Sequence, residues 1–64
     1  LDTSELERLI EGAEKRRREI DQQLGEPDTW QDRALTGRLE TERARIITEL
    51  EPLEFEWSRR AEEA

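Results

Sequence analysis

Four consecutive cations, Lys15, Arg16, Arg17 and Arg18, are the residues best suited by type and spacing to bind phosphate. On a helix, four consecutive residues cover about 300° of arc, so they cannot all face one phosphate backbone. The hydrophobic periodicity places Arg17 on a helix seam, which leaves Lys15, Arg16 and Arg18 as candidate nucleic-acid contacts. The other interpretation of the cluster is a solvated turn that is paired with the flanking glutamates.

The composition argues against catalysis. The 64 residues include no Cys and no His, which removes thiol chemistry, imidazole acid–base chemistry and zinc sites. The chain lacks a phosphate-binding glycine loop and a calcium loop, and its 18 acidic residues make any one carboxylate pair uninformative. We therefore expect a non-enzymatic chain with no cofactor, no metal and no small-molecule substrate. The net charge of −7 repels nucleic acid at long range but allows a local basic contact.

The two tryptophans are the largest apolar side chains. Trp30 lies between the predicted helices, where it either closes the end of the core or anchors a partner. Trp57 falls on the apolar repeat near Phe55, which favours a place in the core or in a self-association surface.

The elements that must position these residues are two amphipathic helices. Apolar residues recur at alternating steps of three and four, which predicts helices at about 4–24 and 33–63, joined by a loop at about 25–32. The predicted fold is all-α, a single antiparallel two-helix coiled-coil hairpin. Its predicted seam consists of Leu6, Ile10, Ala13, Ile20, Leu24, Leu39, Ile46, Leu50, Leu53 and Trp57.

Capping signals support these boundaries. Ser4, with a glutamate three residues later, fits a capping box at the first helix start. Gly25, in a left-handed cap, and Pro27 predict the end of that helix. Asp32 or Asp28 is a suitable cap for the second helix.

The register follows from the numbering. If the chain folds back near residue 30, facing residues have numbers that sum to about 59 or 60, which pairs Ile20 with Leu39 and Ala13 with Ile46. Glutamate-to-base pairs at the i, i+4 spacing favour the same helices. These pairs are Glu11–Lys15, Glu14–Arg18 and Glu56–Arg60.

Three positions interrupt the pattern. Arg17 and Arg43 fall on the seam, where we expect their stems to pack while their guanidinium groups reach Glu42, Glu14 or solvent. Pro52 lies inside the second helix and predicts either a kink or a break into two helices.

No apolar run approaches the roughly 18 residues that a membrane span needs, so no membrane partner is expected. The first residue is Leu1, which suggests a piece of a longer protein, and a cytoplasmic location is the default expectation. A two-helix hairpin buries one seam only, so we also expect self-association.

The sequence Leu-Gly-Glu-Pro-Asp-Thr-Trp-Gln-Asp at residues 24–32 resembles the hairpin tip of the C-terminal coiled-coil extension of ABC-F ATPases. The sequence Leu-Glu-Phe-Glu-Trp at residues 53–57 is similar to a stretch near the end of that extension. The resemblance covers nearly the whole chain, although Pro52 departs from the uninterrupted helix of the family.

This resemblance implies a parent protein with two upstream ATP-binding cassettes that acts at the ribosome, and an accessory arm that contacts ribosomal components, RNA or DNA. The tip also resembles, more weakly, the Pro-Asp-x-Trp turn of the helical N-terminal domain of peptide-chain release factors. A structural coiled-coil module that mediates dimerisation is a third hypothesis.

Overall fold

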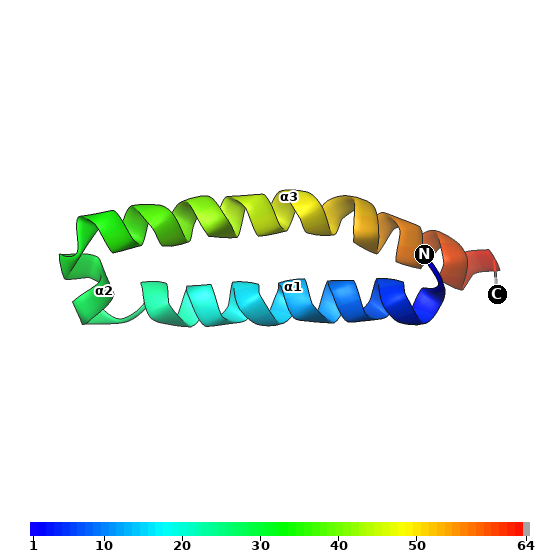
Figure 1. Ribbon diagram of the computed structural model, residues 1–64, viewed down its shortest axis with the longest axis horizontal. Helices are drawn as coiled ribbons and strands as arrows, with labels where there is room; N and C mark the ends of the chain where they lie inside the picture. The colour runs from blue at the N-terminus through cyan, green and yellow to red at the C-terminus, as the bar shows by residue number, and fades with distance from the viewer. Residues whose placement is uncertain (64) are drawn as a thin grey trace.

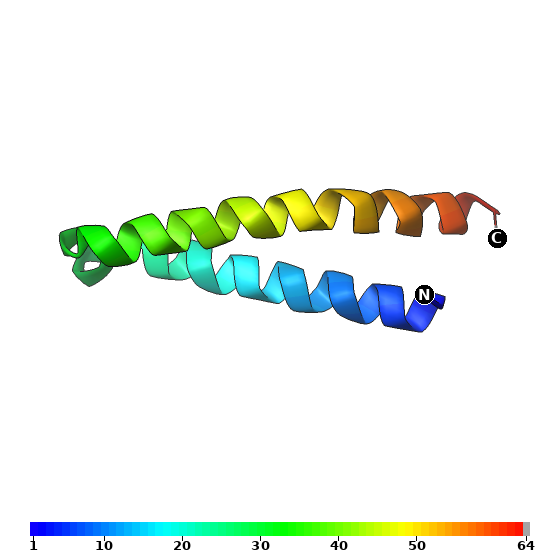
Figure 2. The ribbon, with the colours of Figure 1, turned by 45° about the horizontal axis from the view of Figure 1, so that its top comes forward.

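The computed structural model describes residues 1–63, which fold into three helices. Helix α1 (Thr3–Leu24) and helix α3 (Arg33–Glu63) lie side by side, and the short helix α2 (Pro27–Gln31) joins them at one end. The chain reverses direction at α2, so both termini lie at the opposite, open end (Figure 1). The resulting helical hairpin is 48 Å long and about 16 Å across, and the all-α prediction is confirmed for the described residues. Figure 2 shows that the two long helices cross at a small angle.

The first helix begins earlier than its capping signal predicts. Asp2 is the N-cap, and its carboxylate accepts a hydrogen bond of 2.8 Å from the backbone N–H of Glu5. The predicted cap at Ser4 is therefore wrong, because Asp2 already satisfies a free N–H of the first turn. At the other end Gly25 adopts a right-handed conformation (φ −84°, ψ −7°) and donates its N–H to the carbonyl of Gln22 at 3.1 Å, so the predicted left-handed glycine cap is also wrong.

The predicted loop at 25–32 contains helix α2, which the periodicity does not reveal because it is only five residues long. Pro27 occupies the first turn of α2, where its missing N–H costs no hydrogen bond. Thr29 is buried, and its carbonyl accepts a hydrogen bond of 2.7 Å from the hydroxyl of Thr36 in α3. Asp32 accepts a hydrogen bond of 3.0 Å from the backbone N–H of Leu35, which confirms Asp32 as the cap of α3.

The core is a single line of aliphatic side chains between α1 and α3. The fully buried members are Leu6, Ile20, Leu39, Ile46 and Leu50. Half-buried residues along the same line are Ile10, Ala13, Leu24, Leu35 and Leu53. The sequence predicts that Trp57 lies in the seam, but its side chain is 43% exposed near the open end of the hairpin. One seam is all that two helices can share, so most of the remaining surface stays in water.

Helix α3 continues through Pro52, so the predicted break into two helices does not occur. Pro52 and Thr48 are both exposed, so the Thr48 carbonyl that loses its backbone donor is on the solvent side of the helix. Figure 1 shows α3 curving gently along its length.

Cross-helix contacts test the predicted register. Arg16 pairs with Glu42, and these residue numbers sum to 58. The numbers of Asp21 and Arg43, which also pair, sum to 64. These sums lie within about one helical turn of the predicted value.

Candidate nucleic-acid interface

The predicted basic cluster lies in the middle of α1, and its members differ in exposure and in whether they form ion pairs. Lys15 and Arg18 are exposed and form no ion pair within residues 1–63. Arg16 is half-buried, and its guanidinium holds Glu42 through two hydrogen bonds of 2.6 and 3.0 Å. Lys15 and Arg18 are therefore better placed than Arg16 to receive a phosphate.

The Arg16–Glu42 pair joins α1 to α3. Hydrogen bonding to the guanidinium of Arg16 lowers the pKa of Glu42, and the same bonding raises the pKa of Arg16. We expected Arg17 to approach Glu42, but the bidentate fork comes from Arg16 one residue earlier.

A second cross-helix ion pair joins Arg43 to Asp21 at 2.5 Å, so Arg43 reaches a carboxylate on α1. Of the three predicted i, i+4 pairs, Glu56–Arg60 forms at 2.9 Å. The pairs Glu11–Lys15 and Glu14–Arg18 do not form among the described residues.

Three arginines of α3 belong to the candidate interface and are missing from the sequence prediction. Arg33, Arg38 and Arg45 surround a shallow surface hollow on α3 whose middle is Gly37. A Cβ atom at Gly37 would meet nothing within 4 Å, so this hollow is open to a ligand. The spacing of Arg38 and Arg45, seven residues or two turns apart, is the signal that could have identified this face.

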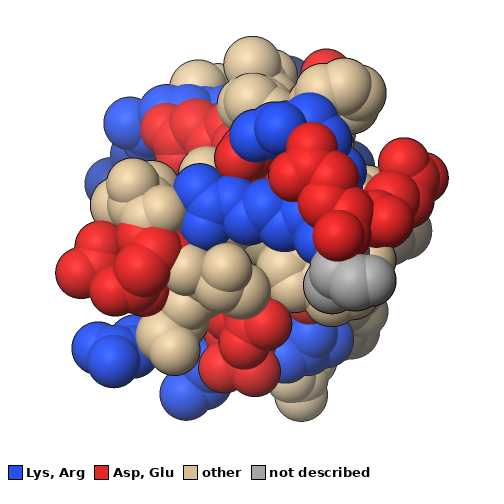
Figure 3. All heavy atoms as spheres, turned by 90° about the vertical axis from the view of Figure 1, so that its right-hand side faces the viewer, with Lys and Arg blue, Asp and Glu red and all other residues tan. Residues whose placement is uncertain are grey.

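Folding separates the charges along the hairpin. The half next to the turn, residues 15–45, contains eight of the 11 Lys and Arg residues and seven of the 18 acids. The open-end half contains the other three bases and 11 acids. Segment sums along the chain hide this separation, because α1 and α3 each run through both halves. Figure 3 looks onto the open end, where acidic and basic side chains lie next to one another.

Two of the three bases of the open-end half, Arg59 and Arg60, are held by acids. Glu56 accepts hydrogen bonds from Arg59 at 2.6 Å and from Arg60 at 2.9 Å. These hydrogen bonds, first from Arg59 and then from Arg60, lower the pKa of Glu56 to about 2. Arg60 also donates to the carbonyl of Leu1 at 2.8 Å, so it ties the end of α3 to the start of the chain.

Trp30 lies on the outside of the turn. Its side chain is 70% exposed, and its indole N–H donates to the carbonyl of Leu24. Thr29, rather than Trp30, closes the end of the core. Of the two interpretations of Trp30 from the sequence, the exposed ring favours an anchor for a partner over a side chain that closes the core.

Within residues 1–63 no group of three or more acidic side chains is arranged to hold a metal ion. None of the helices in this part of the chain combines the length and apolar character that a membrane crossing requires.

Comparisons with protein-family models, with curated proteins and with solved structures found no match to the chain.

Proposed function

We propose that this chain is a non-catalytic accessory arm, an antiparallel two-helix coiled coil that contacts nucleic acid, including ribosomal RNA, through the half next to its turn. The observation that carries this proposal is the separation of charge, which gathers eight of 11 bases into that half. Phosphate contacts by Lys and Arg supply most of the affinity in non-specific nucleic-acid binding.

The proposed contacts are Lys15 and Arg18 from α1 and Arg38 and Arg45 from α3, which project from different sides of the half next to the turn. The Arg16–Glu42 pair lies between the two helices and fixes their relative position. Exposed bases on two helices can meet phosphates on both sides of a groove, whereas the strongly acidic open end is repelled. The arm therefore contacts nucleic acid along the sides of the half next to its turn rather than at its open end.

The parent protein in this proposal resembles an ABC-F ATPase, with two ATP-binding cassettes upstream and an action at the ribosome in the cytoplasm. The support is the resemblance of the sequence at residues 24–32, which includes α2, and of residues 53–57 to the coiled-coil extension of that family. The parent reading frame tests this directly. Two upstream cassettes with Walker motifs support it, and a downstream domain with Gly-Gly-Gln supports a release factor instead.

Binding is tested by fluorescence anisotropy with a labelled 16-base-pair RNA duplex at several salt concentrations. We expect a dissociation constant in the non-specific range, about 10⁻⁴ to 10⁻⁶ M, with a log–log salt slope of about −3 to −4 for four phosphate contacts. Changing both Lys15 and Arg18 to Gln, or both Arg38 and Arg45, should reduce the magnitude of the slope by about 1 to 2, because each lost contact retains a counterion.

The matched control replaces Arg8 and Arg59, which lie in the open-end half, and changes the net charge by the same amount. Circular dichroism checks that each variant keeps its helicity. Equal weakening by the control and by the two interface variants would contradict the proposed face.

A dimerisation module is the second candidate function. Leu9 is 48% exposed and Phe55 is 72% exposed, so apolar side chains remain outside the seam of a single hairpin. A second copy could cover them.

A further inference from the structure

We propose that the open end of the hairpin holds a second binding site, one that takes an arginine-bearing segment of a partner protein. The site is a notch between α1 and α3 that is formed by Glu7, Ile10, Glu14, Glu54 and Trp57, and we call it the open-end notch. Its residue Glu14 directly precedes Lys15 in α1, but its proposed occupant is a basic peptide rather than nucleic acid, so the two proposals are tested separately.

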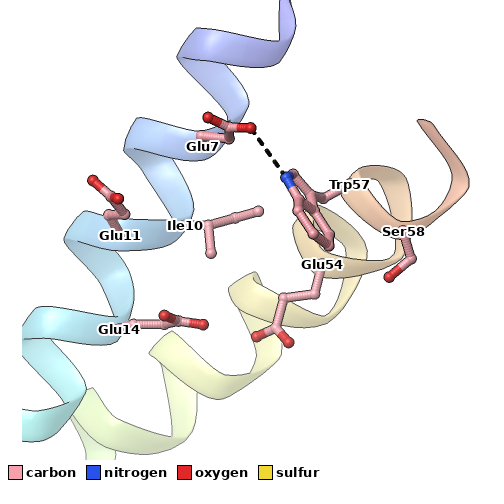
Figure 4. Close-up of a pocket in the computed structure, with 7 residues that line it drawn as sticks. All are labelled: Glu7, Ile10, Glu11, Glu14, Glu54, Trp57 and Ser58. Carbon is pink, nitrogen blue, oxygen red and sulfur yellow. Dashed lines mark hydrogen bonds between the residues drawn. The ribbon is translucent and has the colours of Figure 1, made fainter. Parts of the chain in front are cut away.

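The notch has an apolar wall. The indole of Trp57 is 43% exposed, and the side chain of Ile10 extends toward it from α1 (Figure 4). Glu7 fixes the ring by accepting a hydrogen bond of 3.3 Å from its indole N–H. An aromatic face held in place in this way is a docking surface for a cation, because the ring carries negative charge on its face.

The rim of the notch is acidic. Figure 4 shows Glu14 and Glu54 extending from the two helices toward each other below the ring. None of Glu7, Glu14 and Glu54 forms an ion pair with any residue from 1 to 63, whereas Arg59 and Arg60 are held by Glu56. Glu11 adds a further carboxylate to the lining.

These charges select the occupant. The half that contains the notch has 11 acids and three bases, so a basic segment is attracted and a phosphate backbone is repelled. Arginine fits better than lysine, because its planar guanidinium can stack on the indole while its N–H groups reach Glu14 and Glu54. A peptide with neighbouring arginines can place one guanidinium on the ring and another on the carboxylates.

The test uses tetra-arginine amide as the probe and the fluorescence of Trp57 as the readout, in a Trp30→Phe background in which Trp57 is the single tryptophan. Titration should change the emission of Trp57 with saturation. Tetra-lysine amide should bind about 2 to 5 times more weakly, the fold-change for loss of one exposed cation–π contact, because the planar guanidinium stacks on an indole and the ammonium group does not. The indole N–H resonance of Trp57 should shift along the same titration curve.

A matched pair of double variants tests the location. Glu14→Gln with Glu54→Gln removes two notch carboxylates and should weaken tetra-arginine binding at least fivefold. Glu5→Gln with Glu62→Gln removes two exposed carboxylates from the same end but outside the notch, and should weaken it less than twofold. Circular dichroism establishes that both variants keep the helicity of the parent.

Three outcomes would overturn the proposal. If both double variants weakened tetra-arginine binding equally, the affinity would depend only on the overall charge of this end and not on the notch. Equal affinity for the arginine and lysine peptides would remove the role of the indole. A change in Trp57 emission with protein concentration alone would make a second copy of the chain the occupant. RNA binding by Lys15, Arg18, Arg38 and Arg45 is measured separately and is unaffected by each of these results.

Discussion

Ile20 is the residue on which the hairpin depends most directly, because it has no exposed surface and lies in the core formed with α3. Ile20→Ala removes three carbon atoms from this site. At about 0.8 kcal/mol for each buried carbon, the lost transfer free energy is about 2.4 kcal/mol, and the cavity that remains raises the cost to about 3 kcal/mol. The higher helix propensity of alanine offsets only a few tenths of a kcal/mol.

This loss is large relative to the total. A domain of this size has a free energy of unfolding of about 3 to 10 kcal/mol, so Ile20→Ala should remove at least about a third of it. Ile20→Val removes one carbon and should cost about 1 kcal/mol. The two variants therefore form a series at one position.

Leu9→Ala is the matched control. It also removes three carbons from α1, but Leu9 is 48% exposed, so the expected cost is about 1.2 kcal/mol with no cavity term. Urea denaturation followed by circular dichroism at 222 nm, at one protein concentration, measures all three free energies. A loss for Ile20→Ala no greater than that for Leu9→Ala would refute the idea that a tightly packed seam stabilises the fold.

Three further predictions concern register, acid stability and association. Cysteines at positions 13 and 46 should form a disulfide rapidly, whereas preferential crosslinking of 13 to 53 would contradict the register. The Glu56 carboxyl should titrate by NMR near pH 2 and move toward its ordinary value of 4.5 when Arg59 and Arg60 become Gln. Because the pKa of Glu56 is lower in the folded state, its contribution is present above pH 4.5 and is lost as the pH falls toward 2, and an unchanged midpoint in the double variant would contradict this origin. Sedimentation equilibrium should detect association at millimolar concentration that Phe55→Ser weakens, and a monomer at every concentration would exclude it.

The core was predictable from sequence because it depends on periodicity. Steps of three and four identify Ile20 and Leu39 as buried, whatever the details of the turn. The constant sum of facing residue numbers also places Arg16 and Glu42 within one turn of each other. What periodicity cannot supply is the rotation of each helix about its axis, which decides whether Arg16 or Arg17 meets Glu42.

The start of α1 and the turn were less predictable, since short-range alternatives at both places differ little in energy. Asp2 and Ser4 are both suitable caps, and the choice depends on which turn of α1 packs against α3. Trp30 and Thr29 are neighbours, and the orientation of α2 buries the smaller side chain. The arginines around Gly37 were missed because charge was summed along the chain rather than across the folded hairpin.

The order in which a hairpin closes gives the two ends different kinetic properties. Contacts at the turn join residues close in sequence, such as Thr29 and Thr36, which are seven apart, whereas the bond between Arg60 and Leu1 spans 59 residues. Each doubling of a closed loop costs about 0.6 kcal/mol of chain entropy, so direct closure of the open end is about 1.8 kcal/mol less favourable than closure at the turn. Folding therefore starts at the turn and proceeds like a zipper, and unfolding begins at the termini. Trp57 is among the last side chains to reach its place, so a ligand held against it would slow the first step of unfolding and lengthen the lifetime of the closed hairpin.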